Sequence, residues 1–162
     1  MPDVKHFESL YPIDSREKEL SEIVRFIKEG NSAQIIGLPG VGRSNILGLL
    51  AHNREVRQKH FPTKNSFVHF VFVNFSELHS RPLIDTTKLL FLNLVDSLRE
   101  RDMREEYAVA NEILRESLQI QDEFVIFQGL KRVVEYLSIE KKLTLIFLFD
   151  RFEEYIPMLG HA

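Results

Sequence analysis

A glycine-rich loop is the feature of this sequence whose residue types and spacing point most directly to chemistry. Gly37 and Gly42, followed by Arg43 and Ser44, fit the phosphate-loop pattern G-x-x-x-x-G-K-[ST] at every defined position except the lysine. Glycines allow backbone conformations with positive φ, so that consecutive N–H groups turn toward an anion, and a following helix adds its positive end. The loop therefore predicts a site for nucleotide phosphates.

Two side chains of this loop have a predicted role. Ser44 would place its hydroxyl on a Mg²⁺ ion that bridges the outer phosphates, and the cation at Arg43 would neutralise phosphate charge. A plain glycine-rich turn is the alternative, but an apolar segment before the loop and an amphipathic helix after it favour the phosphate site. The predicted nucleotide-binding residues are Gly37, Leu38, Pro39, Gly40, Val41, Gly42, Arg43, Ser44, Asn45 and Arg16.

A second candidate site follows an apolar run near the end of the sequence. Leu143 to Phe149 is predicted to be a buried strand that delivers Asp150 at its carboxyl end, the edge where parallel sheets bind ligands. Asp150 could hold the water shell of Mg²⁺, and Glu153 could orient an attacking water. Because many strands end in Asp for turn or capping reasons, the interpretation depends on pairing with the loop at Gly37.

Together these motifs resemble the AAA+ and STAND classes of P-loop ATPases. Asp150-Arg-Phe-Glu153-Glu154-Tyr looks like the D-x-F-E-E-[LY] form of Walker B in bacterial STAND ATPases. Ser15-Arg16-Glu17-Lys18-Glu19-Leu20 is similar to the G-R-E-x-E-L box that lies beside the adenine in these families, with Ser15 in place of glycine. The resemblance implies that Arg43 reads phosphate, that Ser44 and Asp150 bind Mg²⁺, and that Glu153 is the catalytic glutamate.

The same resemblance implies a fold and a boundary. It spans about Pro12 to Tyr155, with a helical insert near Arg104 to Leu118. The expected fold is the α/β P-loop NTPase three-layer sandwich, a parallel sheet flanked by helices. A complete module of this type would continue with a sensor strand, a fifth strand and a helical lid. Residues 1–162 are therefore expected to be a partial domain, truncated before the lid.

Hydrophobic periodicity places the elements independently of that resemblance. An Asp14…Glu17 pair resembles a capping box. The helix that begins at Asp122 is expected to bury a face made of Phe124, Phe127, Leu130, Val133, Val134 and Leu137. The predicted helices are Glu17–Glu29, a helix from the loop to about Gln58, Arg81–Arg104, Glu105–Leu118 and the one from Asp122; the predicted strands are Ala33–Ile36, Phe67–Phe75 and Leu143–Phe149. Strands alternating with helices indicate an α/β protein with a parallel sheet covered on both faces.

Composition narrows the functional classes. A net charge of −3 does not steer the chain toward nucleic acid or an anionic membrane. The absence of cysteine excludes disulfides and thiolate chemistry and fits a cytoplasmic protein, while no apolar stretch approaches the roughly 20 residues that span a bilayer. The basic cluster Arg54, Arg57, Lys59, His60 and Lys64 is interpreted as a solvated helix end rather than a nucleic-acid contact, and the histidines as surface residues rather than metal ligands.

The leading hypothesis is a regulatory ATPase module, a nucleotide-dependent switch that uses ATP and Mg²⁺ and acts on a protein partner or through self-association. Hydrolysis is expected to be slow or absent, because Arg43 presents a planar fork where the loop normally holds a compact ammonium. ATP is preferred over GTP, since the sequence has no N-K-x-D segment. The alternatives are a DNA-associated initiator or loader ATPase and a structural scaffold that no longer binds nucleotide.

Overall fold

The computed structural model describes residues 12–38, 40–62, 67–78, 82–120 and 122–155 of the 162-residue chain. The chain divides into two compact units, Met1–Val68 and His69–Ala162, and each is described by itself.

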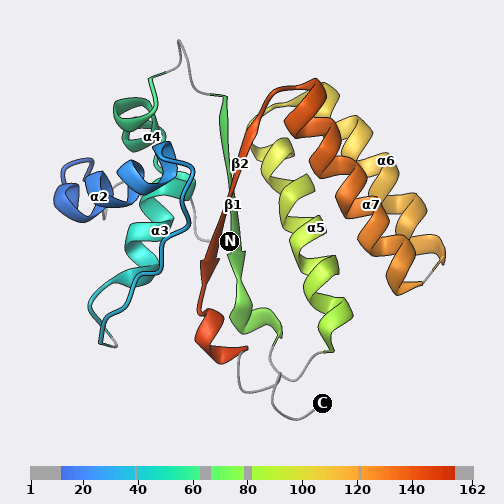
Figure 1. Cartoon of the computed structure of the whole chain (residues 1–162), viewed down its shortest axis with the longest axis horizontal. Helices are drawn as coiled ribbons and strands as arrows, with labels where there is room; N and C mark the ends of the chain where they lie inside the picture. Colours follow the sequence, from blue (N-terminus) through green and yellow to red (C-terminus); the bar gives the residue numbers. More distant parts are fainter. Residues whose placement is uncertain (1–11, 39, 63–66, 79–81, 121, 156–162) are drawn as a thin grey trace. The chain divides into compact units, whose positions relative to one another are not determined.

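Among its described residues, the first unit has the helices α2 (Glu17–Lys28), α3 (Arg43–His52) and α4 (Arg54–His60) (Figure 1). They bury apolar side chains at helical spacing, since Leu20 and Val24 of α2 share one face, as do Ile46, Leu49 and Leu50 of α3. The helix predicted over Glu17–Glu29 is confirmed within one residue.

The helix predicted to run from the loop to Gln58 is interrupted at Asn53. This residue, 4% exposed, ends α3 and begins α4, where its side-chain oxygen accepts a hydrogen bond from Val56 N at 3.0 Å. Arg57 then donates to the Ala51 carbonyl at 2.6 Å and satisfies the end of α3. A short polar side chain that caps the backbone competes with helix continuation, which explains the break.

The start of α2 also differs from the prediction. No side chain caps this helix, and Arg16 stands at the N-cap position with φ of 63°. The Asp14 carbonyl, rather than its carboxylate, accepts from Glu17 N at 3.3 Å. The capping box predicted at Asp14 is therefore wrong, because the turn that ends at Arg16 sets the entry of the chain into the helix.

The strand predicted over Ala33–Ile36 is also wrong. Residues 31–38 belong to no helix or strand, and the side chain of Ile36 is 83% exposed. A strand is defined by inter-strand hydrogen bonds, and a four-residue apolar run is too short to enforce such pairing by its own burial.

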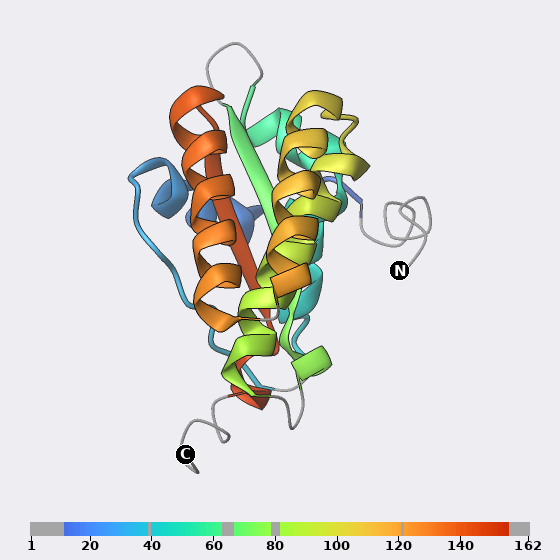
Figure 2. The same ribbon diagram turned by 90° about the vertical axis from the view of Figure 1, so that its right-hand side faces the viewer.

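The second unit combines a small sheet with three long helices. Strands β1 (Val68–Asn74) and β2 (Thr144–Asp150) pair side by side and run in the same direction (Figure 1). The helices α5 (Leu83–Glu100), α6 (Arg104–Ile120) and α7 (Glu123–Glu135) cover one face of this sheet, as Figure 2 shows from the helical side. The shorter elements are η1 (Phe75–Leu78), η2 (Tyr136–Glu140, a π-helix) and η3 (Phe152–Glu154).

One hydrophobic cluster joins the sheet to these helices. Val71 and Val73 of β1 pack with Phe91 and Leu94 of α5 and with Leu114 of α6, and all five are at most 5% exposed. Helix α6 is thus an integral part of the core, whereas the family resemblance implied only a helical insert there. Every long helix and both strands predicted in this half are confirmed within a few residues.

The buried face predicted for the helix from Asp122 is confirmed at Val133 and Leu137, and Leu130 and Val134 also pack against the core, but its first part is wrong. Asp122 caps the helix as predicted, accepting from Phe124 N at 2.9 Å. However, Phe124 and Phe127 are 69% and 54% exposed, and Ile126 and Gly129 are buried instead. Gly129 lies so close to Ser117 of α6 that a Cβ atom added there would clash with the serine side chain.

These elements confirm an α/β protein with a parallel sheet, and the three-layer P-loop sandwich stays a prediction. Within the described ranges, no helix combines the length and apolar character needed to cross a bilayer.

Candidate functional site

The predicted phosphate loop leads from the extended residues 31–38 directly into helix α3. Val41 N donates to the Leu38 carbonyl at 3.3 Å and closes a four-residue turn, in which Gly40 has φ of +84°. Gly42 has φ of +85° and stands at the N-cap of α3. Both angles lie in the left-handed region, which favours glycine at these two positions.

The loop is tightly closed on itself. A Cβ atom added at Gly37 would lie 2.7 Å from Val41 Cγ2 and 3.8 Å from Arg43 Cδ. A Cβ added at Gly42 would lie 2.9 Å from Arg16 Nη2. A side chain at Gly37 or Gly42 would therefore displace a neighbouring side chain, whereas at Gly40 only the backbone conformation favours glycine.

Helix α3 provides the electrostatic half of the candidate site. Asn45 N and Ile46 N both donate to the Gly42 carbonyl, so the helix begins directly at the motif. Its first turn contains no acidic residue. The helix dipole at this end is positive and is not cancelled by a local carboxylate. Ser44 is exposed, and Arg43 and Asn45 are half-buried.

Arg16 reaches the loop from the start of helix α2. Its Nη2 donates to the Val41 carbonyl at 2.7 Å, and its Nη1 donates to Glu19 Oε1 at 3.2 Å. The pKa of Glu19 lies below its usual value because its own backbone N–H and then Arg16 donate hydrogen bonds to it. A single guanidinium therefore connects the loop to the first turn of α2.

The predicted Walker B residues lie in the second unit, where β2 ends. Asp150 is the last residue of the strand and is 7% exposed. Arg151 follows with φ of 55°, and the chain then enters η3 with Glu153 exposed. The prediction that a strand delivers Asp150 at its carboxyl end is confirmed, but the prediction that this strand is buried is wrong for most of it, since only Leu148 and Asp150 are buried and Phe149 is 43% exposed.

Aromatic rings hold this end of the sheet in place. Phe75, at the end of β1, contacts Phe149 and Phe152 edge-on with centroid distances of 5.1 and 4.9 Å, and Tyr155 at 5.5 Å. Such edge-to-face pairs are favourable beyond the area that they bury. The backbone on both sides of Asp150 is thereby anchored to β1.

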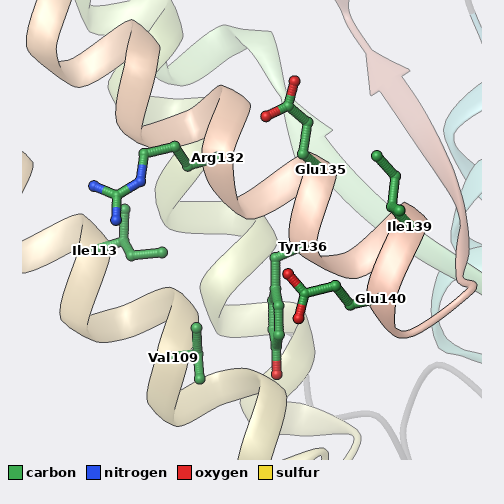
Figure 3. Close-up of a pocket in the computed structure, with 7 residues that line it drawn as sticks. All are labelled: Val109, Ile113, Arg132, Glu135, Tyr136, Ile139 and Glu140. Atoms are coloured by element: carbon green, nitrogen blue, oxygen red, sulfur yellow. The ribbon is translucent and has the colours of Figure 1, made fainter.

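A separate groove of about 550 Å³ lies in the second unit between α6, the end of α7 and η2 (Figure 3). Apolar Val109, Ile113 and Ile139 line it together with charged Arg132 and Glu140. None of the residues that line this groove was predicted to bind nucleotide.

The basic cluster of the first unit is largely used within the fold. Lys59 Nζ lies 2.7 Å from Glu17 Oε2, and Arg57 caps α3. His60 is 8% exposed and His69 2%, so the prediction that the histidines lie on the surface is wrong for these two. Lys64 and His79 lie outside the described residues, as does Pro39 of the loop. Among the side chains that the structure describes, no three of His, Asp or Glu gather as metal ligands would.

Sequence reasoning did not find the contact between Arg16 and the loop. The resemblance placed Arg16 beside adenine, whereas its hydrogen bond joins residues 25 positions apart. The one local signal is the i, i+3 spacing of Arg16 and Glu19, which favours a salt bridge across the first helical turn.

Comparisons with protein-family models, with curated proteins and with solved structures found no match for this chain.

Proposed function

We propose that Gly37–Ser44 binds the phosphates of ATP and that the chain is a nucleotide-dependent switch. The observation that carries the proposal is the shape of the loop: each glycine of the motif stands where a side chain is disfavoured, and Gly42 opens the positive end of α3. This combination of positive φ, tight closure and a helix N-terminus is the physical basis of phosphate binding in such loops.

The Val41 amide has to change partner when phosphate binds. It donates to Leu38 over 3.3 Å, a long hydrogen bond that costs little to exchange. A phosphate oxygen is a stronger acceptor because it is charged.

Hydrolysis is proposed to be slow or absent. Arg43 replaces the lysine of the motif, and phosphoryl transfer depends on where the cation lies. Steady-state ATP hydrolysis and ATP affinity are to be compared between the wild type and Arg43→Lys. We expect Arg43→Lys to turn over ATP at least as fast as the wild type, with similar affinity. Faster turnover in the wild type would reject this part of the proposal.

Mg²⁺, when bound, would neutralise phosphate charge, and Ser44 and Asp150 are the residues proposed to hold it. Their oxygen atoms suit this hard cation. Glu153 is proposed to orient the attacking water. In this account Asp150→Asn reduces the gain in ATP affinity that Mg²⁺ brings, while binding of ATP in EDTA is unchanged.

Calorimetric titration with ATP and Mg²⁺ tests the proposal, with Gly42→Ala as the disrupting variant. Gly30→Ala is the matched control, since Gly30 also has a positive φ, of 74°, but lies after α2 and has nothing within 4 Å of an added Cβ. Binding should be lost in Gly42→Ala and retained in Gly30→Ala. A silent titration of the wild type would favour the structural scaffold instead.

A further inference from the structure

The Val41–Gly42 peptide unit links Arg16 to the proposed phosphate site. The Val41 carbonyl, which accepts from Arg16 Nη2 at 2.7 Å, and the Gly42 N–H belong to the same trans peptide. In a planar trans peptide these two groups point in opposite directions. A guanidinium that holds the carbonyl therefore fixes the direction of the Gly42 N–H, which points away from Arg16.

Arg16 itself is held in an uncommon conformation. Its φ of 63° lies in the left-handed region, which is unfavourable for a non-glycine residue. Its guanidinium is tied at two positions, to Val41 and to Glu19. A strained backbone persists where the surrounding contacts over-determine it, and such positions concentrate at functional sites.

Gly42 makes room for this contact. An added Cβ at Gly42 would come within 2.9 Å of Arg16 Nη2 and 3.3 Å of Asn45 Nδ2. The glycine before Arg43 thus serves two purposes, because it adopts positive φ and admits the guanidinium beside the loop backbone.

We propose that Arg16 is a positioning residue of the phosphate site, which acts through the Val41–Gly42 peptide to aim the Gly42 N–H at a bound phosphate. The proposal rests on the proposed function of the loop. It assigns Arg16 to the triphosphate rather than to the adenine that the family resemblance suggested. The guanidinium of Arg16 suits this positioning role, since one nitrogen donates to the Val41 carbonyl while another donates to Glu19.

Three probes separate these roles: Mg²⁺-ATP, inorganic tripolyphosphate and adenosine, each titrated calorimetrically into the wild type and its variants. We expect Arg16→Ala to weaken ATP and tripolyphosphate by the same factor, about tenfold, as for loss of one charge-assisted hydrogen bond. Adenosine binding should not change. Arg16→Lys keeps the charge and a donor but not the planar guanidinium. Its affinity for ATP and tripolyphosphate should lie between those of the wild type and of Arg16→Ala.

Arg25→Ala is the matched control. Arg25 lies on the same helix, pairs with Glu29 at 3.8 Å and is 60% exposed, so its removal changes the net charge equally without touching the loop. The amide resonance of Gly42 adds a readout that simple helix stabilisation would not move. Tripolyphosphate should shift it strongly in the wild type and in Arg25→Ala, and weakly in Arg16→Ala.

The outcomes distinguish this inference from the function on which it rests. A wild type that binds neither ATP nor tripolyphosphate overturns both. A wild type that binds both, with Arg16→Ala behaving like Arg25→Ala, overturns the inference alone. Weaker binding of ATP and adenosine with unchanged tripolyphosphate binding would place Arg16 at the base and also overturn it. Should Arg16→Ala fail to fold by circular dichroism, the same comparisons apply to Arg16→Lys.

Discussion

Two apolar segments precede the two candidate motifs, one in each unit, and only one of these segments is a strand. Residues 144–150 form β2, which pairs with β1, and Leu148 is 5% exposed. Residues 31–38 form no strand, and Ile36 is 83% exposed. Both segments contain the β-branched and aliphatic residues that favour strands.

The difference between the two segments shows that a strand depends on distant parts of the chain, whereas the loop conformation depends on neighbouring residues. A strand requires a ladder partner and a covered face, and β2 has both within its own unit, from β1 and from helices α5, α6 and α7. The predicted phosphate loop needs neither a ladder partner nor a covered face. Its conformation follows from Gly40, Gly42 and the start of α3, and it forms after a segment that is not a strand.

Substitution of Leu148 should give the largest effect. Leu148→Ala deletes a buried side chain from β2 and is expected to lower the free energy of unfolding by about 2–5 kcal/mol. Urea unfolding followed by circular dichroism measures the change. A loss below about 1 kcal/mol would mean that β2 is not held by the burial described.

A substitution at the contact between α6 and α7 should lower the free energy of unfolding by nearly as much as Leu148→Ala. Gly129→Ala places a methyl group against Ser117 Oγ and within 3.1 Å of Phe91 Cε1. Overpacking of this kind costs about 1–3 kcal/mol, although alanine favours helices by about 1 kcal/mol. The double variant Gly129→Ala/Ser117→Gly should recover part of the loss in the same unfolding assay. No recovery would show that Ser117 is not the obstacle.

A buried histidine should make the first unit sensitive to acid. Burial lowers the pKa of His60 from its ordinary value of 6.5, outweighing the attraction of Glu17. The folded state therefore binds fewer protons than the unfolded chain, so stability is full above pH 6.5 and falls as the pH decreases below it. The Tm should drop between pH 7.5 and pH 5.5 in the wild type and drop less in His60→Leu. An equal drop in Tm in the wild type and in His60→Leu would show that His60 is not the source of the acid sensitivity.

Ile36 should give the smallest effect and sharpens the contrast with Leu148. Since its side chain is 83% exposed, Ile36→Ala should change the free energy of unfolding by less than about 0.5 kcal/mol. The urea assay used for Leu148→Ala applies unchanged. A cost near that of Leu148→Ala would mean that residues 31–38 are buried in a sheet after all.

Much of the second unit could be predicted because its signals are local and periodic. The apolar spacing of α5 and α6, the cap at Asp122 and the continuous apolar run of β2 each determine an element by themselves. The burial of Ile126 and Gly129 in place of Phe124 and Phe127 was not predicted, because the close packing of Gly129 against Ser117 involves another helix.

In the first unit, too, the predictions that failed concern side-chain contacts that hydrophobic periodicity does not report. Asn53 ends a helix because its side chain binds the backbone ahead of it, which competes with apolar periodicity. The position of the loop was predictable from Gly37 and Gly42 alone. Its contact with Arg16 joins residues 25 positions apart, and no spacing rule connects them.

The central claim, that Gly37–Ser44 binds the phosphates of ATP, is tested most directly by amide resonances of the seven glycines during titration with ATP and Mg²⁺. The account predicts the largest shifts at Gly40 and Gly42, and none at Gly129, which lies in helix α7. Saturating ATP that leaves the resonances of Gly40 and Gly42 unmoved would contradict it.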